Sequence, residues 1–167
     1  MVPAFALYAL KFVRPSLDPM GLHIGPGIEL AFNIENSNLL TLRDVRMICL
    51  FGAMEFGRPT GEDFSKPPRR KTPGDLCRQI AASPDWAKAG TLQGDVRRLG
   101  DIPPYEGRRT NCTFAIGANV ARAEVAIGVS YVLHVIPRVP WDRHICVERE
   151  LLKDDAGNLQ WSSPLPE

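Results

Sequence analysis

The chain has 167 residues, of which 44% are hydrophobic and 23% are charged, a composition typical of a soluble globular protein that can bury its own core. Its 20 basic and 19 acidic residues give a formal net charge of +1, so no overall electrostatic field recruits nucleic acid or an anionic membrane. These values exclude a chain that is disordered throughout and predict a single domain over residues 1–167.

The amino-terminal stretch Met1–Leu10 is apolar, but it has only half of the roughly twenty residues that a membrane-spanning helix needs. It also lacks the basic start and the small-residue cleavage site of a signal peptide. Two interpretations stay open. The stretch is either a first β-strand, which we favour, or the outer end of a membrane tether whose beginning precedes Met1.

Two strands are predicted in the next part of the chain. From Ile28 to Glu35 apolar and polar residues alternate, a period of two that is typical of a strand with one buried face. Asn36–Asn38 consists of turn-forming residues. Alternation resumes from Asp44 to Phe51, with a less polar second face. We therefore expect two strands that are joined through a turn.

The segment 58–107 is predicted to be a long, irregular insertion. Its first part is polar and rich in proline, and we interpret the basic run Pro67–Lys71 as a solvated loop rather than a phosphate-binding or nuclear-targeting sequence. Asp75–Ala82 has the apolar spacing of a short helix, with Asp75 near its beginning. Because long insertions in small domains are often functional, a specific site is expected here if the protein has one.

The last third of the chain contains the clearest strand pattern. Ala123–Leu133 alternates strictly and is rich in β-branched residues, which favours a strand over a helix. Further strands are predicted at Thr110–Ile116, at His144–Leu151 after a turn over Pro137–Asp142, and at Leu159–Trp161. About seven to nine strands, separated by many prolines and glycines, predict an all-β fold. We expect an immunoglobulin-like antiparallel β-sandwich with the long, partly helical insertion.

The sequence contains no convincing motif for catalysis or cofactor binding. Gly128–Val132 has a central serine, but it ends in valine and lies inside a strand pattern, whereas a nucleophile elbow needs a strand-to-helix turn. Glycine-rich phosphate-binding motifs are absent. Asn111–Thr113 matches the N-glycosylation acceptor pattern, which we interpret as a coincidence within a strand. We expect no cofactor and no enzymatic activity.

A metal site is the alternative that the histidines allow. His144 and Cys146 are two residues apart on a predicted strand and share a face, and His134 lies on the hairpin partner. Zinc sites usually need a fourth ligand or an open water position in a pocket. We therefore favour the interpretation of these three side chains as ordinary sheet residues.

Two tryptophans are candidates for contacts with a protein partner, because exposed tryptophans often anchor interfaces. Trp141 follows a proline in the predicted hairpin turn, and Trp161 lies near the end of the chain. The alternative, which we favour, is that each ring packs over one end of the sandwich.

Four cysteines are scattered along the chain without C-x-x-C spacing: Cys49, Cys77, Cys112 and Cys146. This spacing predicts neither a thioredoxin-like redox motif nor a zinc knuckle. An even number of cysteines is compatible with disulfides in an oxidising compartment, and it is equally compatible with free thiols in the cytoplasm.

Several short segments share an order with known sequences: Leu17–Pro19, a strand that ends in Asn36, Asp44–Val45 leading to Cys49, Val139–Trp141 and Gly157–Trp161. Over 17–48 and 110–166 the chain resembles a group of uncharacterised bacterial membrane-anchored proteins, in which a short membrane helix precedes an immunoglobulin-like extracytoplasmic domain. The resemblance supplies no activity, and this chain lacks the full membrane span. It implies that Cys49 and Cys112 face each other across the sandwich and form a disulfide. The alternative is two buried free thiols.

From these observations we expect a non-catalytic extracytoplasmic binding or structural module, whose partner is a protein or a component of the cell envelope. Two alternatives from other classes stay open. One is a small metal-binding protein or metalloenzyme that uses His134, His144 and Cys146. The other is a subunit that assembles through an exposed edge strand.

Overall fold

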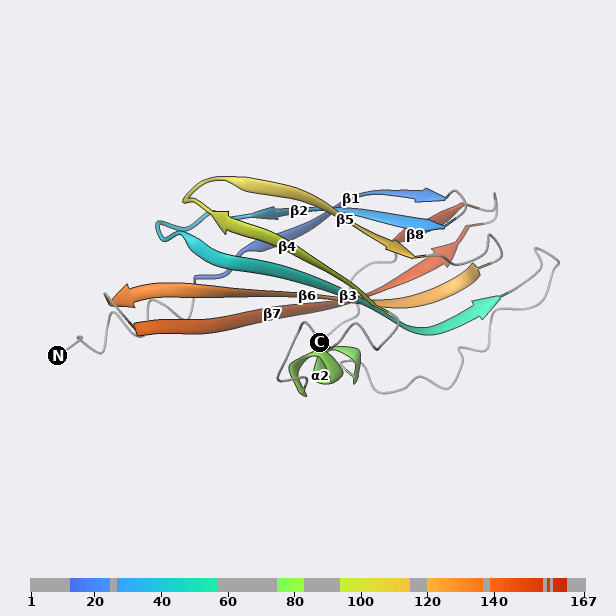
Figure 1. Cartoon of the computed structure of the whole chain (residues 1–167). Coiled ribbons are helices and arrows are strands. Elements are labelled where there is room, and N and C mark those ends of the chain that lie inside the picture. The colour runs from blue at the N-terminus through green and yellow to red at the C-terminus, as the bar shows by residue number, and fades with distance from the viewer. Residues whose placement is uncertain are drawn as a thin grey trace.

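Two antiparallel β-sheets lie face to face around one apolar layer (Figure 1). The computed structural model describes residues 13–24, 27–56, 75–82, 94–114, 120–136, 139–154, 156 and 158–161. The smaller sheet has the order β1-β2-β5, with bounds Ser16–Ile24, Ile28–Glu35 and Gly107–Phe114. The larger sheet has the order β4-β3-β6-β7-β8, with bounds Gly94–Ile102, Leu42–Phe56, Val120–Ile136, Val139–Lys153 and Leu159–Trp161. The all-β sandwich predicted from the sequence is confirmed.

The buried layer between the sheets is built by the alternation that the sequence shows. In β2 the apolar side chains from Ile28 to Ile34 are at most 2% exposed, while the residues between them are partly exposed. In β6 the side chains at alternate positions from Ala123 to Leu133 point into the same layer. Each fully buried aliphatic or aromatic side chain contributes about 1.5–3 kcal/mol to folding, so these two strands supply a large share of the core.

The predicted insertion contains a strand that the sequence reasoning missed. Asp75–Ala82 forms helix α2, as expected, but β4 lies within the segment that was expected to be irregular and pairs with β3. Consecutive arginines at 97 and 98 interrupt the apolar alternation of β4. Charged residues of this kind are common on edge strands, and β4 is at the edge of its sheet. Pairing with β3 therefore determines this strand more than its own pattern does.

Two further differences concern the beginning of β7 and the whole of β1, a strand that was not predicted. β7 begins at Val139 and so includes residues that were expected to form a turn. β1 had no clear alternation because Pro19 precedes a register shift between Pro19 and Gly21, a position where an edge strand tolerates proline. The strand expected at Met1–Leu10 and the basic run Pro67–Lys71 lie outside the described residues.

Asn36 joins the two sheets at one end of the sandwich. Its side chain is fully buried, and its amide nitrogen Nδ2 donates to the carbonyl oxygens of Leu40 at 2.8 Å and of Ile102 and Pro103, both at 3.0 Å. Its backbone carbonyl also accepts a hydrogen bond from the backbone N–H of Tyr105 at 2.7 Å. One side chain therefore fixes the β2–β3 connection against the β4–β5 connection.

Candidate functional site

Helix α2 lies on the outer face of the larger sheet, on the side away from β1, β2 and β5 (Figure 1). Ile80 of the helix is 2% exposed and packs into a small second apolar cluster, separate from the main core. The sheet contributes Ile48, Leu50 and Ala126 to this cluster. The inward face of the sheet thus forms the core, and part of its outward face binds the helix.

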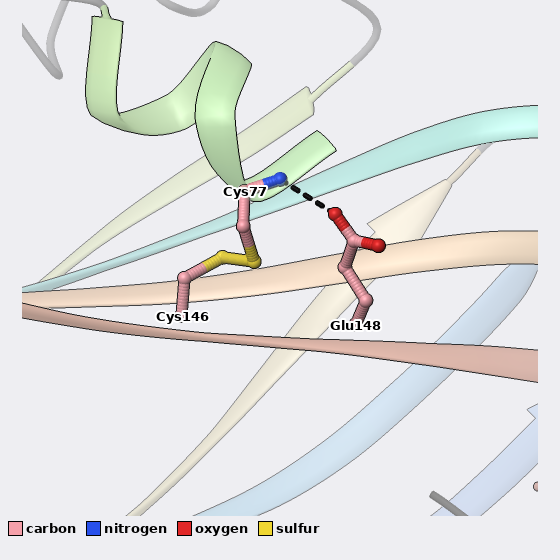
Figure 2. Close-up of a disulfide and its surroundings, with 3 residues drawn as sticks. All are labelled: Cys77, Cys146 and Glu148. Atoms are coloured by element: carbon pink, nitrogen blue, oxygen red, sulfur yellow. Dashed lines mark hydrogen bonds between the residues drawn. A yellow bond between two sulfur atoms is a disulfide. The ribbon is translucent and has the colours of Figure 1, made fainter. Parts of the chain in front are cut away.

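A disulfide between Cys77 and Cys146 links the helix to β7 (Figure 2). Next to it, the backbone N–H of Cys77 donates to Oε1 of Glu148 at 2.7 Å. The first N–H groups of a helix have no partner within the helix, and a carboxylate at this end also interacts favourably with the helix dipole. The bridge and the cap both come from the same outward face of β7, because residues 146 and 148 are two apart on a strand.

The disulfide adds a covalent attachment to a helix of eight residues. Isolated helices of fewer than about 12 residues are marginal in water. The helix buries one apolar side chain fully, Ile80, and Leu76 and Cys77 only partly. The covalent link to Cys146 limits how far the helix can move from the sheet.

Carboxylates gather beside the helix on the outer face. Glu124 on β6 is directly opposite Glu150 on β7, a like-charge pair that is unfavourable when it has no other partner. Arg122 forms an ion pair with Glu150, and the two side chains are only 15% and 8% exposed. The structure thus buries the carboxylate of Glu150 beside its partner.

A glycine on β3 leaves the space for the helix. A methyl group added at Gly52 would lie 2.8 Å from Cδ1 of Leu76 in α2 and 3.2 Å from Cβ of Glu124. We expect Gly52→Ala to lower the free energy of unfolding by about 1–3 kcal/mol through overpacking and to raise amide exchange in α2. Gly21→Ala is the matched control, since nothing lies within 4 Å of its added methyl group. Equal stability and equal exchange in the two variants would contradict the prediction.

The predicted disulfide residues Cys49 and Cys112 lie in the core between the sheets and are both 0% exposed. The structure joins them, with their Cα atoms 6.4 Å apart, inside the limit of about 7 Å for a bridge. The Cys77–Cys146 pair was missed. A signal was present in the sequence, because Cys146 alternates out of phase with the apolar residues of its strand, and pairing Cys49 with Cys112 leaves Cys77 as its partner.

The alternative metal set does not come together in the structure. The sulfur of Cys146 is bonded to Cys77, so it is not a metal ligand. His144 is opposite Ser130, whereas His134 is four positions further along β6, a separation of about 13 Å along the strand. Among the described residues no group of three metal-ligating side chains occurs. The structure therefore does not bring these three side chains together as a set of metal ligands.

The two tryptophans pack against the core, which is the alternative that we favoured. Trp161 is partly buried, and its ring centroid lies 5.7 Å from that of Phe32. Trp141 is also partly buried against the core, and the guanidinium of Arg143 lies 5.5 Å from its ring centroid, within the range of a cation–π contact. Neither ring stands free as an exposed anchor.

Tyr131 links β6 to the chain that precedes β1. Its side chain is buried, and its hydroxyl donates to the carbonyl oxygen of Val13 at 2.8 Å. Burial raises the pKa of Tyr131, because it disfavours the phenolate, and this effect outweighs the attraction of the Arg143 guanidinium, which lowers the pKa.

A raised pKa for a buried tyrosine predicts a loss of stability in alkali. The folded state holds the phenolic proton more tightly than the unfolded state. The contribution of protonated Tyr131 to the free energy of unfolding is therefore complete below about pH 10, and it is lost as the pH rises through the folded-state pKa. We expect the difference in free energy of unfolding between the wild type and Tyr131→Phe to shrink over this range. Urea unfolding at a series of pH values measures it. A difference that stays constant from pH 8 to pH 11 would refute the prediction.

The fold and its bridges define a disulfide-linked antiparallel β-sandwich. Comparison with protein-family models, with curated proteins and with solved structures finds no match for this chain. In the part of the chain that the structure describes, no helix is long and apolar enough to cross a membrane.

Proposed function

We propose that the protein is a non-catalytic binding or structural module of immunoglobulin-like type that works in an oxidising compartment outside the cytoplasm. The observation that carries this proposal is the state of the cysteines: all four are in disulfides, and no free thiol is left. Disulfides persist in oxidising compartments and are rare in the cytoplasm.

The outer face of the larger sheet is the part of the molecule that best fits a binding role. A disulfide to β7 and the hydrogen bond from the Cys77 N–H to Glu148 hold α2 there, apart from the main core. The helix presents exposed side chains, Gln79 and Ala82 among them. A rigid scaffold that presents a segment inserted between two strands is a common arrangement for recognition.

Mass analysis of protein recovered from its native compartment tests the location. The protein is alkylated at once without reductant and then digested. The proposal expects peptides that contain Cys49 bound to Cys112 and Cys77 bound to Cys146, with no alkylated cysteine. Four alkylated cysteines would contradict the proposed location outside the cytoplasm.

Photo-crosslinking in the native cell tests the binding role. A photo-reactive residue at Gln79 on α2 is expected to capture a partner at a defined mass. The same residue at Asp18, exposed on β1 of the opposite sheet, is the matched control and is expected to capture much less. Equal crosslinking at the two positions would argue against the outer face as the binding surface.

A second candidate function is assembly with another copy of this chain through the edge of β7. β8 pairs with β7 only at Leu151–Lys153, and no other described strand pairs with that side of residues 139–150. An unpaired strand edge exposes a row of N–H and C=O groups that another strand can bind.

Sedimentation at increasing protein concentration tests this second candidate. If β7 edges pair, the mass should approach that of a dimer, and Val147→Lys should restore the monomer, because an inward-pointing charge on an edge strand opposes pairing. Val132→Lys is the matched control, since Val132 lies on β6 and is paired on both sides. A wild-type monomer at all concentrations would reject edge assembly.

A further inference from the structure

The two disulfides differ in their access to solvent. Cys49 and Cys112 are both 0% exposed and belong to the main core between the sheets. Cys77 and Cys146 are both partly exposed and lie at the margin of the small outer cluster. Figure 2 shows the outer bridge running directly from the helix to the strand. A disulfide is reduced by a thiolate that must reach one of its sulfur atoms, and burial shields the inner bridge from such attack more than the outer one.

The two disulfides also differ in what they hold. The inner bridge joins β3 to β5 and so connects the two sheets. The outer bridge joins α2 to β7, and the noncovalent contacts of the helix include Ile80 and Leu76 on the small outer cluster and the hydrogen bond from Cys77 to Glu148. Opening the outer bridge therefore releases the helix, while the inner bridge and the main core keep the sandwich folded.

We propose that the Cys77–Cys146 disulfide is a redox-sensitive clasp, which an external dithiol opens to release α2 from the sheet while the sandwich stays folded. In this exchange one thiolate of the dithiol attacks a sulfur of the bridge and forms a mixed disulfide, and the other cysteine leaves as a thiolate. The second thiol of the reductant, as its thiolate, then attacks the reductant's sulfur in the mixed disulfide, and the remaining protein cysteine leaves as a thiolate. Two electrons pass to the protein, which gains two thiols, and the reductant becomes a disulfide.

Release changes the chemistry of the outer face. The apolar side chains Ile48, Leu50 and Ala126, which pack with Ile80 in the closed state, become accessible. Glu148 loses the backbone N–H of Cys77 as a hydrogen-bond donor. The oxidised form thus presents a docked helix, and the reduced form presents an apolar strip of the sheet beside a carboxylate.

Graded treatment of the oxidised protein with dithiothreitol at neutral pH tests the clasp. Samples are alkylated at intervals and the modified cysteines are identified by mass spectrometry. Cys77 and Cys146 are expected to react together, at least about tenfold faster than Cys49 and Cys112. Reaction of all four cysteines at one rate would overturn the proposal, because it would mean that both bridges open only on global unfolding.

Hydrogen exchange on the same samples separates release of the helix from simple reduction. When the outer bridge is open, the protection factors of amides in 76–82 are expected to fall at least about tenfold. Those of amides in Val125–Val129 on β6 are expected to stay unchanged. Unchanged protection of the helix after reduction would also overturn the proposal.

The double variant Cys77→Ser/Cys146→Ser provides the control. It is expected to show fast exchange in α2 without reductant, protected amides in β6 and no further change in the exchange of α2 when dithiothreitol is added. Protected amides in β6 establish that the variant is folded. If the variant has protected amides in both β6 and α2, the disulfide does not hold the helix on the sheet, and the proposal is overturned.

Discussion

Asn36→Asp is expected to lower the free energy of unfolding by about 3–5 kcal/mol, although the two side chains have nearly the same shape. The Asn36 amide nitrogen donates to three carbonyl oxygens, those of Leu40, Ile102 and Pro103. A carboxylate places an acceptor with a negative charge at the same point. The three carbonyls then lose their donor, and a buried, negatively charged oxygen faces them in place of the amide nitrogen.

Two further variants separate the contribution of the charge from that of the lost hydrogen bonds. Asn36→Ala removes the donor without adding a charge, so we expect a smaller loss of about 1–3 kcal/mol. Asn38→Ala is the matched control, because Asn38 donates to Asn36 Oδ1 and to the carbonyl oxygen of Arg14 in a more exposed setting. Urea unfolding measures all three. If Asn36→Asp is as stable as Asn38→Ala, the side chain of Asn36 does not hold the two connections together.

The importance of Asn36 was beyond sequence reasoning for a physical reason. The residues 36–38 were correctly predicted to interrupt a strand, and asparagine is common in such positions. Its three carbonyl partners include two that are 66 and 67 residues away. Hydrogen bonds between distant segments leave no local pattern, since any residue can supply a backbone carbonyl.

The elements that could be predicted are those in which burial repeats along the strand. β2 and β6 place every second side chain in the core, so their period of two is visible in the sequence. β1 and β4 are edge strands, and fewer of their side chains are buried. β1 contains a proline, and β4 contains charged residues. For such strands the partner strand determines the structure, and a single sequence does not reveal it.

The candidate site shows the same division between local and distant information. A short helix over Asp75–Ala82 was predicted from its own apolar spacing, and the structure has a helix there. Its attachment to the sheet depends on Cys146 and Glu148, about seventy residues later. His144 shares their face, and this led the sequence reasoning to consider a metal site where the structure has a disulfide.

Removal of the inner disulfide by Cys49→Ala/Cys112→Ala is expected to lower the free energy of unfolding by about 2–5 kcal/mol. The two bridges of this protein allow the causes of such a loss to be separated. They close sequence separations of 63 and 69 residues, so the entropy that each removes from the unfolded chain differs by less than about 0.1 kcal/mol in the chain-entropy model. Any large difference between their removals must come from the folded state.

From the folded structure we expect removal of the inner bridge to lower the free energy of unfolding more than removal of the outer bridge does. Both inner sulfur atoms are buried in the main core, so their loss leaves a cavity whose lining loses contacts. Cys77→Ala/Cys146→Ala instead allows the helix to leave the sheet and regain conformational entropy, which offsets part of the loss. We therefore expect the inner variant to be less stable by about 1–2 kcal/mol when both are unfolded in urea without reductant. If the outer variant is the less stable, α2 contributes more to the fold than its single buried side chain implies, and the independent release of the helix from the sandwich has to be abandoned.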